Sequence, residues 1–253
     1  MSSSAKQPEQ GCSLAESDRR YYLDTMGIQT WQSRFVSEVD AGLVEELLTA
    51  ESEPAAESSA SIISSRADVS SMDWAQLQQT VASCQLCELH SSRNNTVFGT
   101  GNQNADLLIV TEAPGADEDL AAEPFVGPVG ELLDAMLKAI KLERQQVYIT
   151  NVIKCQTPDN RNPHVSETLC CDPYLQRQIA LLQPKLILAL GRIAAHHLLV
   201  SQESLASLRE RAHKYNGIPL LVSYHPAYLL RKPVNKRKSW QDLLKAKQLL
   251  SSR

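Results

Sequence analysis

The sequence predicts an α/β protein built as a three-layer α/β/α sandwich with a four-stranded parallel sheet. Four short runs of almost continuous apolar residues indicate strands that are covered on both faces. These runs are 107-LLIVT-111, 147-VYITNV-152, 186-LILAL-190 and 220-LLVSY-224. Amphipathic segments with helical spacing alternate with the runs, at 130–141, 166–182, 191–199 and 240–251. Right-handed helical crossovers between parallel strands place the sheet between two helical layers.

The residues before this pattern form two further parts. Residues 1–50 are expected to be an N-terminal extension that is partly helical, because several apolar residues share one helical face. These residues are Val39, Leu43, Leu47 and Leu48. Residues 51–72 are rich in Ser, Ala and Glu and bury too little apolar surface to become ordered, so they are predicted to be a linker. The sandwich domain then occupies residues 73–253.

The composition is that of a folded protein without membrane spans. Of its 253 residues 43% are hydrophobic, and the longest apolar stretches are far too short to cross a bilayer. The first residues, MSSSAKQPEQ, lack the apolar region of a signal peptide. We therefore expect a cytoplasmic protein whose six cysteines stay reduced, which favours metal ligation over disulfides.

Charge is distributed unevenly along the chain. The formal net charge is −4, but residues 1–70 carry −7 and the rest of the chain carries +3. The last 29 residues, from His225 onward, carry +7. A basic surface on a nearly neutral domain favours a nucleic-acid partner, and a solvated helix face is the ordinary alternative.

Polar and glycine-rich groups follow the predicted strands at one edge of the sheet. In a parallel α/β sheet, ligands bind beyond the carboxyl ends of the strands. The groups found there are TEAPGADED, Asn151, Gly191 and HPAYLLR. The Pro-Gly turn in the first group can point backbone N–H groups at a ligand, although such a turn after a strand is usually ordinary. The sequence therefore predicts an active site on this edge.

Three side chains near this edge have both a chemical and a structural interpretation. Phe125 lies in the loop PFVGP and either stacks on a planar ligand or fills the core. The Asn151 amide offers an acceptor and donors that match the N3–H and O4 edge of uracil and mismatch cytosine, or it satisfies a turn. His225 is either a catalytic group or a structural loop residue.

The cysteines form a second pattern. Cys84 and Cys87 make a C-x2-C pair, and Cys155 and Cys171 are two further, more widely spaced thiols. One short turn can aim both sulfurs of a C-x2-C pair at one metal, so the pattern fits zinc, an iron–sulfur centre or ordinary buried thiols. Cys170 is adjacent to Cys171, and the spacing alone leaves open which of the two faces the site.

The ordered set of motifs resembles one family, the family 4 uracil-DNA glycosylases, which are the iron–sulfur branch of their superfamily. The motifs run through residues 80 to 250 as C-x2-C before VFGTGN, then TEAPGADED, PFVGPVG, TNVIKC, DNRNP, Cys171-x-Pro-Tyr-Leu and HPAYLLR. The resemblance implies a uracil-DNA glycosylase-like catalytic domain that flips uracil out of DNA and hydrolyses its N-glycosidic bond. The products are free uracil and an abasic site, as in base-excision repair. We further expect a monomer that needs no nucleotide cofactor.

The resemblance also implies the residues of the site. Phe125 would stack on the flipped base, Asn151 would read its edge, and His225 would donate a hydrogen bond toward uracil O2. Three residues of the strand-end loop would complete the base pocket: Ala113, Pro114 and Gly115. A wedge and a basic run would contact DNA: Leu229, Leu230, Arg231, Lys236, Arg237 and Lys238. A structural 4Fe-4S cluster would be bound by Cys84, Cys87, Cys155 and Cys171, the last chosen over Cys170 because Asp-Pro-Tyr-Leu follows it.

Three positions depart from the related motifs. Ala113 stands where the better-known branch of the superfamily has a water-activating aspartate, so Glu112 is the nearest carboxylate and the predicted catalytic partner of His225. Thr111 and Ala122 stand where glycine is usual, which matters if either backbone needs a positive φ. Two alternatives stay open on this ground. One is a catalytically weak iron–sulfur DNA-binding protein, and the other is a glycosylase for another deaminated base such as hypoxanthine.

Overall fold

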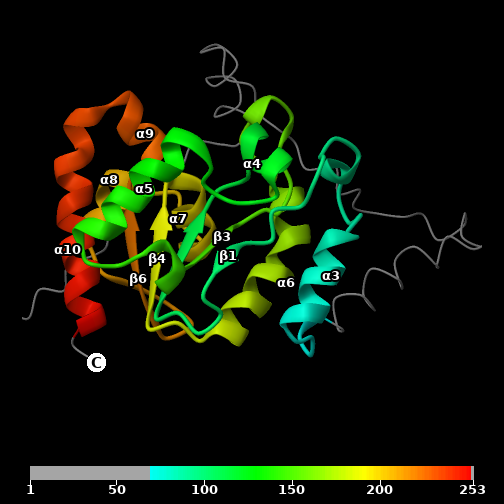
Figure 1. The fold of residues 1–253 in the computed structure, drawn as a ribbon, viewed down its shortest axis with the longest axis horizontal. Helices are drawn as coiled ribbons and strands as arrows, with labels where there is room; N and C mark the ends of the chain where they lie inside the picture. The colour runs from blue at the N-terminus through cyan, green and yellow to red at the C-terminus, as the bar shows by residue number, and fades with distance from the viewer. Residues whose placement is uncertain (1–68, 252–253) are drawn as a thin grey trace, which may run out of the picture. The chain divides into compact units, whose positions relative to one another are not determined.

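The computed structural model describes residues 69–251, whose centre is a six-stranded sheet with the order β1-β3-β2-β4-β6-β5 (Figure 1). The four inner strands are parallel and are those predicted: β2 Leu107–Thr111, β3 Tyr148–Asn151, β4 Leu186–Leu190 and β6 Ile218–Ser223. The predicted count of four was incomplete, because β1 Thr100–Gly101 and β5 His213–Tyr215 pair antiparallel at the two edges. Two or three residues are too few to produce an alternation that a sequence pattern can reveal.

Helices cover both faces of the sheet, as the continuous apolar strands predict (Figure 1). Alternate residues of β2 point to opposite faces, so Leu107 and Ile109 join one buried cluster and Leu108 and Val110 the other. The first cluster packs against α5 Gly127–Ala139 and α10 Lys236–Ser251. The second packs against three helices: α3 Trp74–Ala82, α6 Val165–Leu182 and α7 Arg192–Leu199. The three-layer sandwich is therefore confirmed.

The long helices match their predicted positions, while the short ones were missed. The predicted segments 130–141, 166–182, 191–199 and 240–251 correspond to α5, α6, α7 and α10, and each observed helix begins within a few residues of its prediction. Four further helices have weak or short patterns: α3, α4 Ala116–Ala121, α8 Leu205–Glu210 and α9 Pro226–Arg231. Single turns of 3-10 helix lie at Glu88–Ser91, Arg144–Gln146, Pro158–Asn160 and Pro233–Asn235.

Two of these short helices follow strands at the end of the sheet where the site was predicted. The acidic segment after β2 forms α4, and its Asp119 is fully buried, accepting hydrogen bonds from the backbone N–H groups of Asn94 and Asn95. The HPAYLLR segment forms α9 rather than a loop, with Pro226 at its first position, where a missing N–H group does no harm. Both strand-end segments thus contain a short helix rather than an open loop alone.

The extension predicted at 1–50 and most of the predicted linker lie outside the described residues. Val69 is buried in the cluster that packs against α3 and α6, so the packed chain includes at least the last four residues of the predicted linker. Among residues 69–251, none of the helices has the length and apolarity that a membrane span requires.

Candidate active site

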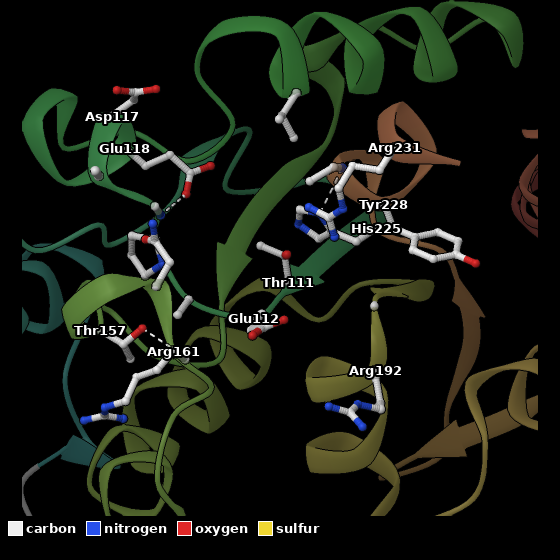
Figure 2. Close-up of a pocket in the computed structure, with 18 of the residues that line it drawn as sticks. Thr111, Glu112, Asp117, Glu118, Thr157, Arg161, Arg192, His225, Tyr228 and Arg231 are labelled. Carbon is white, nitrogen blue, oxygen red and sulfur yellow. Dashed lines mark hydrogen bonds between the residues drawn. The ribbon is translucent and has the colours of Figure 1, made fainter. Parts of the chain in front are cut away.

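A cavity of about 830 Å³ opens at the carboxyl ends of the parallel strands. Two segments supply most of its wall, Thr111–Glu118 after β2 and the segment from Tyr224 to Arg231 that includes α9. Figure 2 shows Glu112 between these two walls, with Glu118 on one side and His225, Tyr228 and Arg231 on the other. The predicted edge of the sheet therefore carries a cavity large enough for a nucleobase and its sugar.

The structure brings the predicted site residues together in two layers. Six of them line the cavity itself: Glu112, Ala113, Pro114, Gly115, His225 and Arg231. Phe125 and Asn151 lie directly behind this lining. The Phe125 ring stacks on the His225 ring with centroids 5.4 Å apart and an angle of 22° between the planes. Asn151 is paired with the lining residue Thr111 across the β2–β3 ladder.

The hydrogen bonds of His225 determine which ring nitrogen carries its proton. The Ala227 backbone N–H donates to Nδ1 of His225 over 3.1 Å, so a neutral ring carries its proton on Nε2. Burial, together with the positive charge of nearby Arg231, lowers the pKa of His225 to about 4. Gly191 has a φ of 95°, which glycine adopts freely, and a β-carbon there would lie only 3.3 Å from the β-carbon of His225. At neutral pH His225 is therefore a neutral hydrogen-bond donor.

Asn151 is fully buried, and neither its Oδ1 nor its Nδ2 atom has a hydrogen-bond partner among the described residues. The buried hydroxyl of neighbouring Thr111 likewise has no partner within residues 69–251. An unsatisfied buried polar group costs roughly 1–3 kcal/mol, so native structures keep few of them. The end of β3, directly behind the cavity wall, therefore holds an unused donor and acceptor on one amide, which is the arrangement expected of a ligand-reading group.

Phe125 is held in place by Glu118, which the sequence did not single out. One carboxylate oxygen of Glu118 accepts from the Phe125 backbone N–H over 2.6 Å, and the other accepts from the Gly115 N–H over 2.7 Å. Phe125 has a φ of 58°, and a side chain on Gly130 would overlap its carbonyl group. Burial raises the pKa of Glu118, and the two amide hydrogen bonds oppose that rise. The single carboxylate of Glu118 thus joins the loop after β2, at Gly115, to the backbone of Phe125.

Replacing Glu118 with glutamine is expected to lower the free energy of unfolding by about 1–3 kcal/mol. The Gln amide oxygen can accept from one of the two N–H groups, but its NH2 group faces the other donor. Urea unfolding monitored by circular dichroism measures this change. Asp117→Asn is the matched control, because the adjacent Asp117 is exposed. Equal stabilities of the two variants would show that Glu118 does not clamp the two loops.

Of the three positions that depart from the related motifs, the two that stand where glycine is usual differ in their consequences. Thr111 is the last residue of β2 and has no positive φ, so its backbone does not require glycine. Ala122 ends α4 with a φ of 55°, a left-handed conformation that costs an alanine on the order of 1 kcal/mol and that glycine adopts freely. The strain at Ala122 lies in the loop before Phe125 and leaves the cavity wall in place.

Two arginines at the cavity were not predicted. Arg192 follows Gly191 at the start of α7, and its positive charge opposes the rise in the pKa of Glu112 that burial causes. Arg161 is held by Glu167 through two hydrogen bonds of 2.9 and 2.6 Å. Figure 2 shows Arg161 beside Thr157, across the cavity from α9, and Arg192 below His225 and Tyr228. Arg161 lies within the DNRNP motif, so the sequence contained a signal for it, whereas no motif indicated Arg192.

The predicted metal ligands lie near one another but are arranged as free thiols. Cys84, Cys87, Cys155 and Cys171 interact electrostatically, and burial raises the pKa of Cys87 to about 11 and that of Cys171 to about 12. Within residues 69–251, no three His, Cys, Asp or Glu side chains are placed to hold one metal ion. Cys170 is half-buried, and its thiol donates to the Leu86 carbonyl over 3.3 Å.

The predicted DNA-contacting residues are only partly exposed. Leu229 is 1% exposed and belongs to the core cluster beside α5 and α10, so its prediction as a wedge in the base stack was wrong. Leu230 is 41% exposed. A helix turns by about 100° per residue, so two adjacent residues face different directions and only one is available to DNA. The four predicted cations are exposed: Arg231, Lys236, Arg237 and Lys238.

Comparison with known proteins shows the family of the chain. The family model of the uracil DNA glycosylase superfamily matches residues 98–244. The chain is 40% identical to the type-4 uracil-DNA glycosylase of Pyrobaculum aerophilum over 182 residues, which cover 68% of this chain and 92% of that protein. It is 40% identical to that of Archaeoglobus fulgidus over 177 residues, covering 67% and 89%. It is 35% identical to that of Thermotoga maritima over 178 residues, covering 69% and 93%. A match that spans the sheet and its cavity and covers most of each relative shows that the chain belongs to the type-4 branch of the uracil-DNA glycosylase superfamily.

Proposed function

We propose that this chain is a DNA glycosylase that hydrolyses the N-glycosidic bond of uracil in DNA, releasing uracil and leaving an abasic site. The observation that carries the proposal is the buried Asn151 amide, whose donor and acceptor atoms have no partner among the described residues. The N3–H group of uracil can donate to Oδ1, and its O4 atom can accept from Nδ2. Cytosine presents the opposite pattern at both positions. Family membership supports the same substrate.

The cavity requires the nucleotide to leave the helical stack. The glycosidic bond is inaccessible in stacked DNA, so the base must be flipped into the pocket, which is easier for a mismatched pair. Phe125 stacks on His225 behind the cavity wall, and we propose that it supports one face of the ring once the base has entered. Leu230 is an exposed apolar residue of α9 that can fill the gap in the stack. Arg192 and Arg231 lie at the cavity wall, where they can contact phosphates flanking the flipped nucleotide.

His225 stabilises the charge that develops as the bond breaks. Electrons flow from the glycosidic bond into the pyrimidine, and negative charge gathers on O2. The Nε2–H group of a neutral His225 can donate to that oxygen, and a donor aimed at developing charge is worth about 100-fold in rate. The sugar becomes positively charged in the same step, so a weak nucleophile such as water is sufficient to complete hydrolysis. Two half-buried carboxylates line the cavity, and Glu118 is engaged by two backbone N–H groups, so Glu112 is the one that can orient this water.

Excision of the base from a defined oligonucleotide tests the function. The protein is incubated with a single-stranded or duplex substrate that contains one uracil, without added nucleotide, and then treated with alkali. Scission at the uracil position is the expected result. Parallel substrates that contain hypoxanthine measure the range of lesions. Binding without scission of any substrate would support the alternative of a catalytically weak DNA-binding protein.

We further propose a structural 4Fe-4S cluster bound by Cys84, Cys87, Cys155 and Cys171. The donor set suits this group, since four thiols from three chain segments lie close enough to influence one another. Each thiolate of such a cluster binds a different iron, so the sulfurs stay farther apart than around a single ion. Arg93 donates to the Cys155 sulfur over 3.0 Å and supplies a positive charge beside the thiolates. Bound there, the cluster would brace the segment between Asn151 and Cys155.

Serine substitution of the two adjacent cysteines separates the cluster ligand from its neighbour. Purified protein is expected to be brown, with absorbance at about 400 nm. Cys171→Ser should lose most of this absorbance and bound iron, because Cys171 is buried among the other thiols. Cys170→Ser is the matched control and should keep both, since its thiol bonds to a backbone carbonyl. Colourless protein with stoichiometric zinc, or equal losses in both variants, would refute the assignment.

The exposed cations at the start of α10 are proposed to contact the DNA backbone. Replacing Lys236, Arg237 and Lys238 with glutamine should flatten the dependence of DNA affinity on salt, by up to about 0.9 in log–log slope for each phosphate that is no longer neutralised. Fluorescence anisotropy at several salt concentrations measures the slope. The control changes Lys245 and Lys247, farther along the same helix, to glutamine. An unaltered slope in the first variant would place the DNA-binding surface elsewhere.

A further inference from the structure

A buried ion pair contacts the two residues that precede His225. Arg209 of α8 and Asp242 of α10 are 8% and 2% exposed. The Arg209 Nε and Nη2 atoms donate to the two carboxylate oxygens of Asp242 over 2.8 and 2.9 Å. Neither residue lines the cavity, and neither is used in the mechanism above. Such a pair restrains geometry strongly, because both charges are held by several hydrogen bonds.

Each member of the pair holds one of these two residues. The Ser223 hydroxyl, at the end of β6, donates to Asp242 Oδ2 over 2.8 Å. The guanidinium group of Arg209 lies over the Tyr224 ring, 4.5 Å from its centroid. Tyr224 in turn stacks on Tyr228 of α9 with centroids 5.1 Å apart. The chain on both sides of His225 is therefore attached to the ion pair, through Ser223 and Tyr224 before it and Tyr228 after it.

The pair is itself anchored to the backbone of α10. Arg209 Nη2 donates a further hydrogen bond of 2.9 Å to the Lys238 carbonyl oxygen. Asp242 is one turn farther along the same helix. Replacing a buried ion pair with apolar residues often leaves stability unchanged or improved, so stability alone does not explain its presence. Its contacts point to a geometric role.

We propose that Arg209 and Asp242 are positioning residues that hold the segment Ser223–His225 so that the His225 ring keeps its place in the cavity wall. The inference rests on the proposed glycosylase function, in which the Nε2–H group of His225 must meet one oxygen of the base. Catalytic rates are sensitive to such placement, and a displacement of about 1 Å can lower a rate about 100-fold. The pair acts through Ser223 and Tyr224 and touches no substrate.

Arg209→Lys is the decisive variant, because it keeps the positive charge but loses the two-pronged hydrogen bond and the flat surface that stacks on Tyr224. Its kcat for uracil excision is expected to fall about 10-fold or more, while KM for the oligonucleotide changes less than about 2-fold. Arg211→Lys is the matched control. Arg211 pairs with Glu203 at the surface, where both side chains are about half exposed, and its kcat should equal that of the unmodified protein.

A second readout reports on the His225 ring directly. In protein with 15N-labelled histidine, the His225 signals of the unmodified chain should show a proton on Nε2, and Arg209→Lys should shift or broaden them. Ser223→Ala serves if Arg209→Lys does not fold, since it removes one hydrogen bond and no charge; its kcat should fall about 3- to 10-fold. Unchanged kcat and unchanged His225 signals in the folded variant would overturn the inference. If the unmodified protein excises no uracil, the proposed function fails, and the His225 signals alone decide the positioning role.

Discussion

Replacing Asn151 with aspartate is expected to lower the rate of uracil excision by about 10⁴- to 10⁵-fold. Sites that recognise a ligand through buried hydrogen bonds discriminate by about this factor when one partner is removed. Asn151 presents one acceptor and one donor without partners among the described residues, and an aspartate carboxylate presents acceptors alone. Its second oxygen would face uracil O4 and repel it. Single-turnover excision followed by alkaline scission measures the loss.

Asn104→Asp is the matched control for this change, because Asn104 is exposed and does not line the cavity. It should leave the rate unchanged. Excision of cytosine by the Asn151→Asp variant should be measured as well, since a carboxylate suits the amino group of cytosine. Excision of uracil at the normal rate by the Asn151→Asp variant would show that Asn151 does not contact the base.

Replacing His225 with leucine is expected to lower kcat for uracil excision by about 100-fold, because the Nε2–H donor to the departing base is lost. DNA affinity should change little, since the basic residues of α9 and α10 remain. His164→Leu is the control, because His164 is exposed at the start of α6 and its ring makes no capping hydrogen bond. A normal kcat in the His225→Leu variant would show that charge on the base is stabilised by other groups.

The pKa of His225 also predicts how stability depends on pH. The unfolded chain binds a proton at this residue near pH 6.5, whereas the folded chain binds it only near pH 4. Stability from this residue is therefore complete above pH 6.5 and is lost as the pH falls toward 4, because the unfolded state binds the proton first. The free energy of unfolding of His225→Leu should depend less steeply on pH in this interval. If the free energies of unfolding of the two proteins depended equally on pH in this interval, the pKa of His225 would not be lowered by folding.

Most of the fold follows from local patterns in the chain. Strands β2 and β4 begin and end where their apolar runs do. Both faces of a buried parallel strand are covered, so almost every position is apolar and the run marks the whole strand. The edge strands β1 and β5 were missed because each has only two or three residues and forms by pairing with an inner strand. Helix α9 was missed because a proline and six residues give too short a repeat for a periodicity.

The sequence by itself determined the fold class, the edge of the sheet that carries the site, and the residue types gathered there, because apolar runs, turn residues and ordered motifs are local properties of the chain. Only the tertiary structure decided that Leu229 is buried while Leu230 is exposed, and that the Asn151 amide has no partner among the described residues. It also revealed the Glu118 clamp and the Arg209–Asp242 pair behind His225. Burial and pairing depend on residues far apart in the chain, so no local pattern records them.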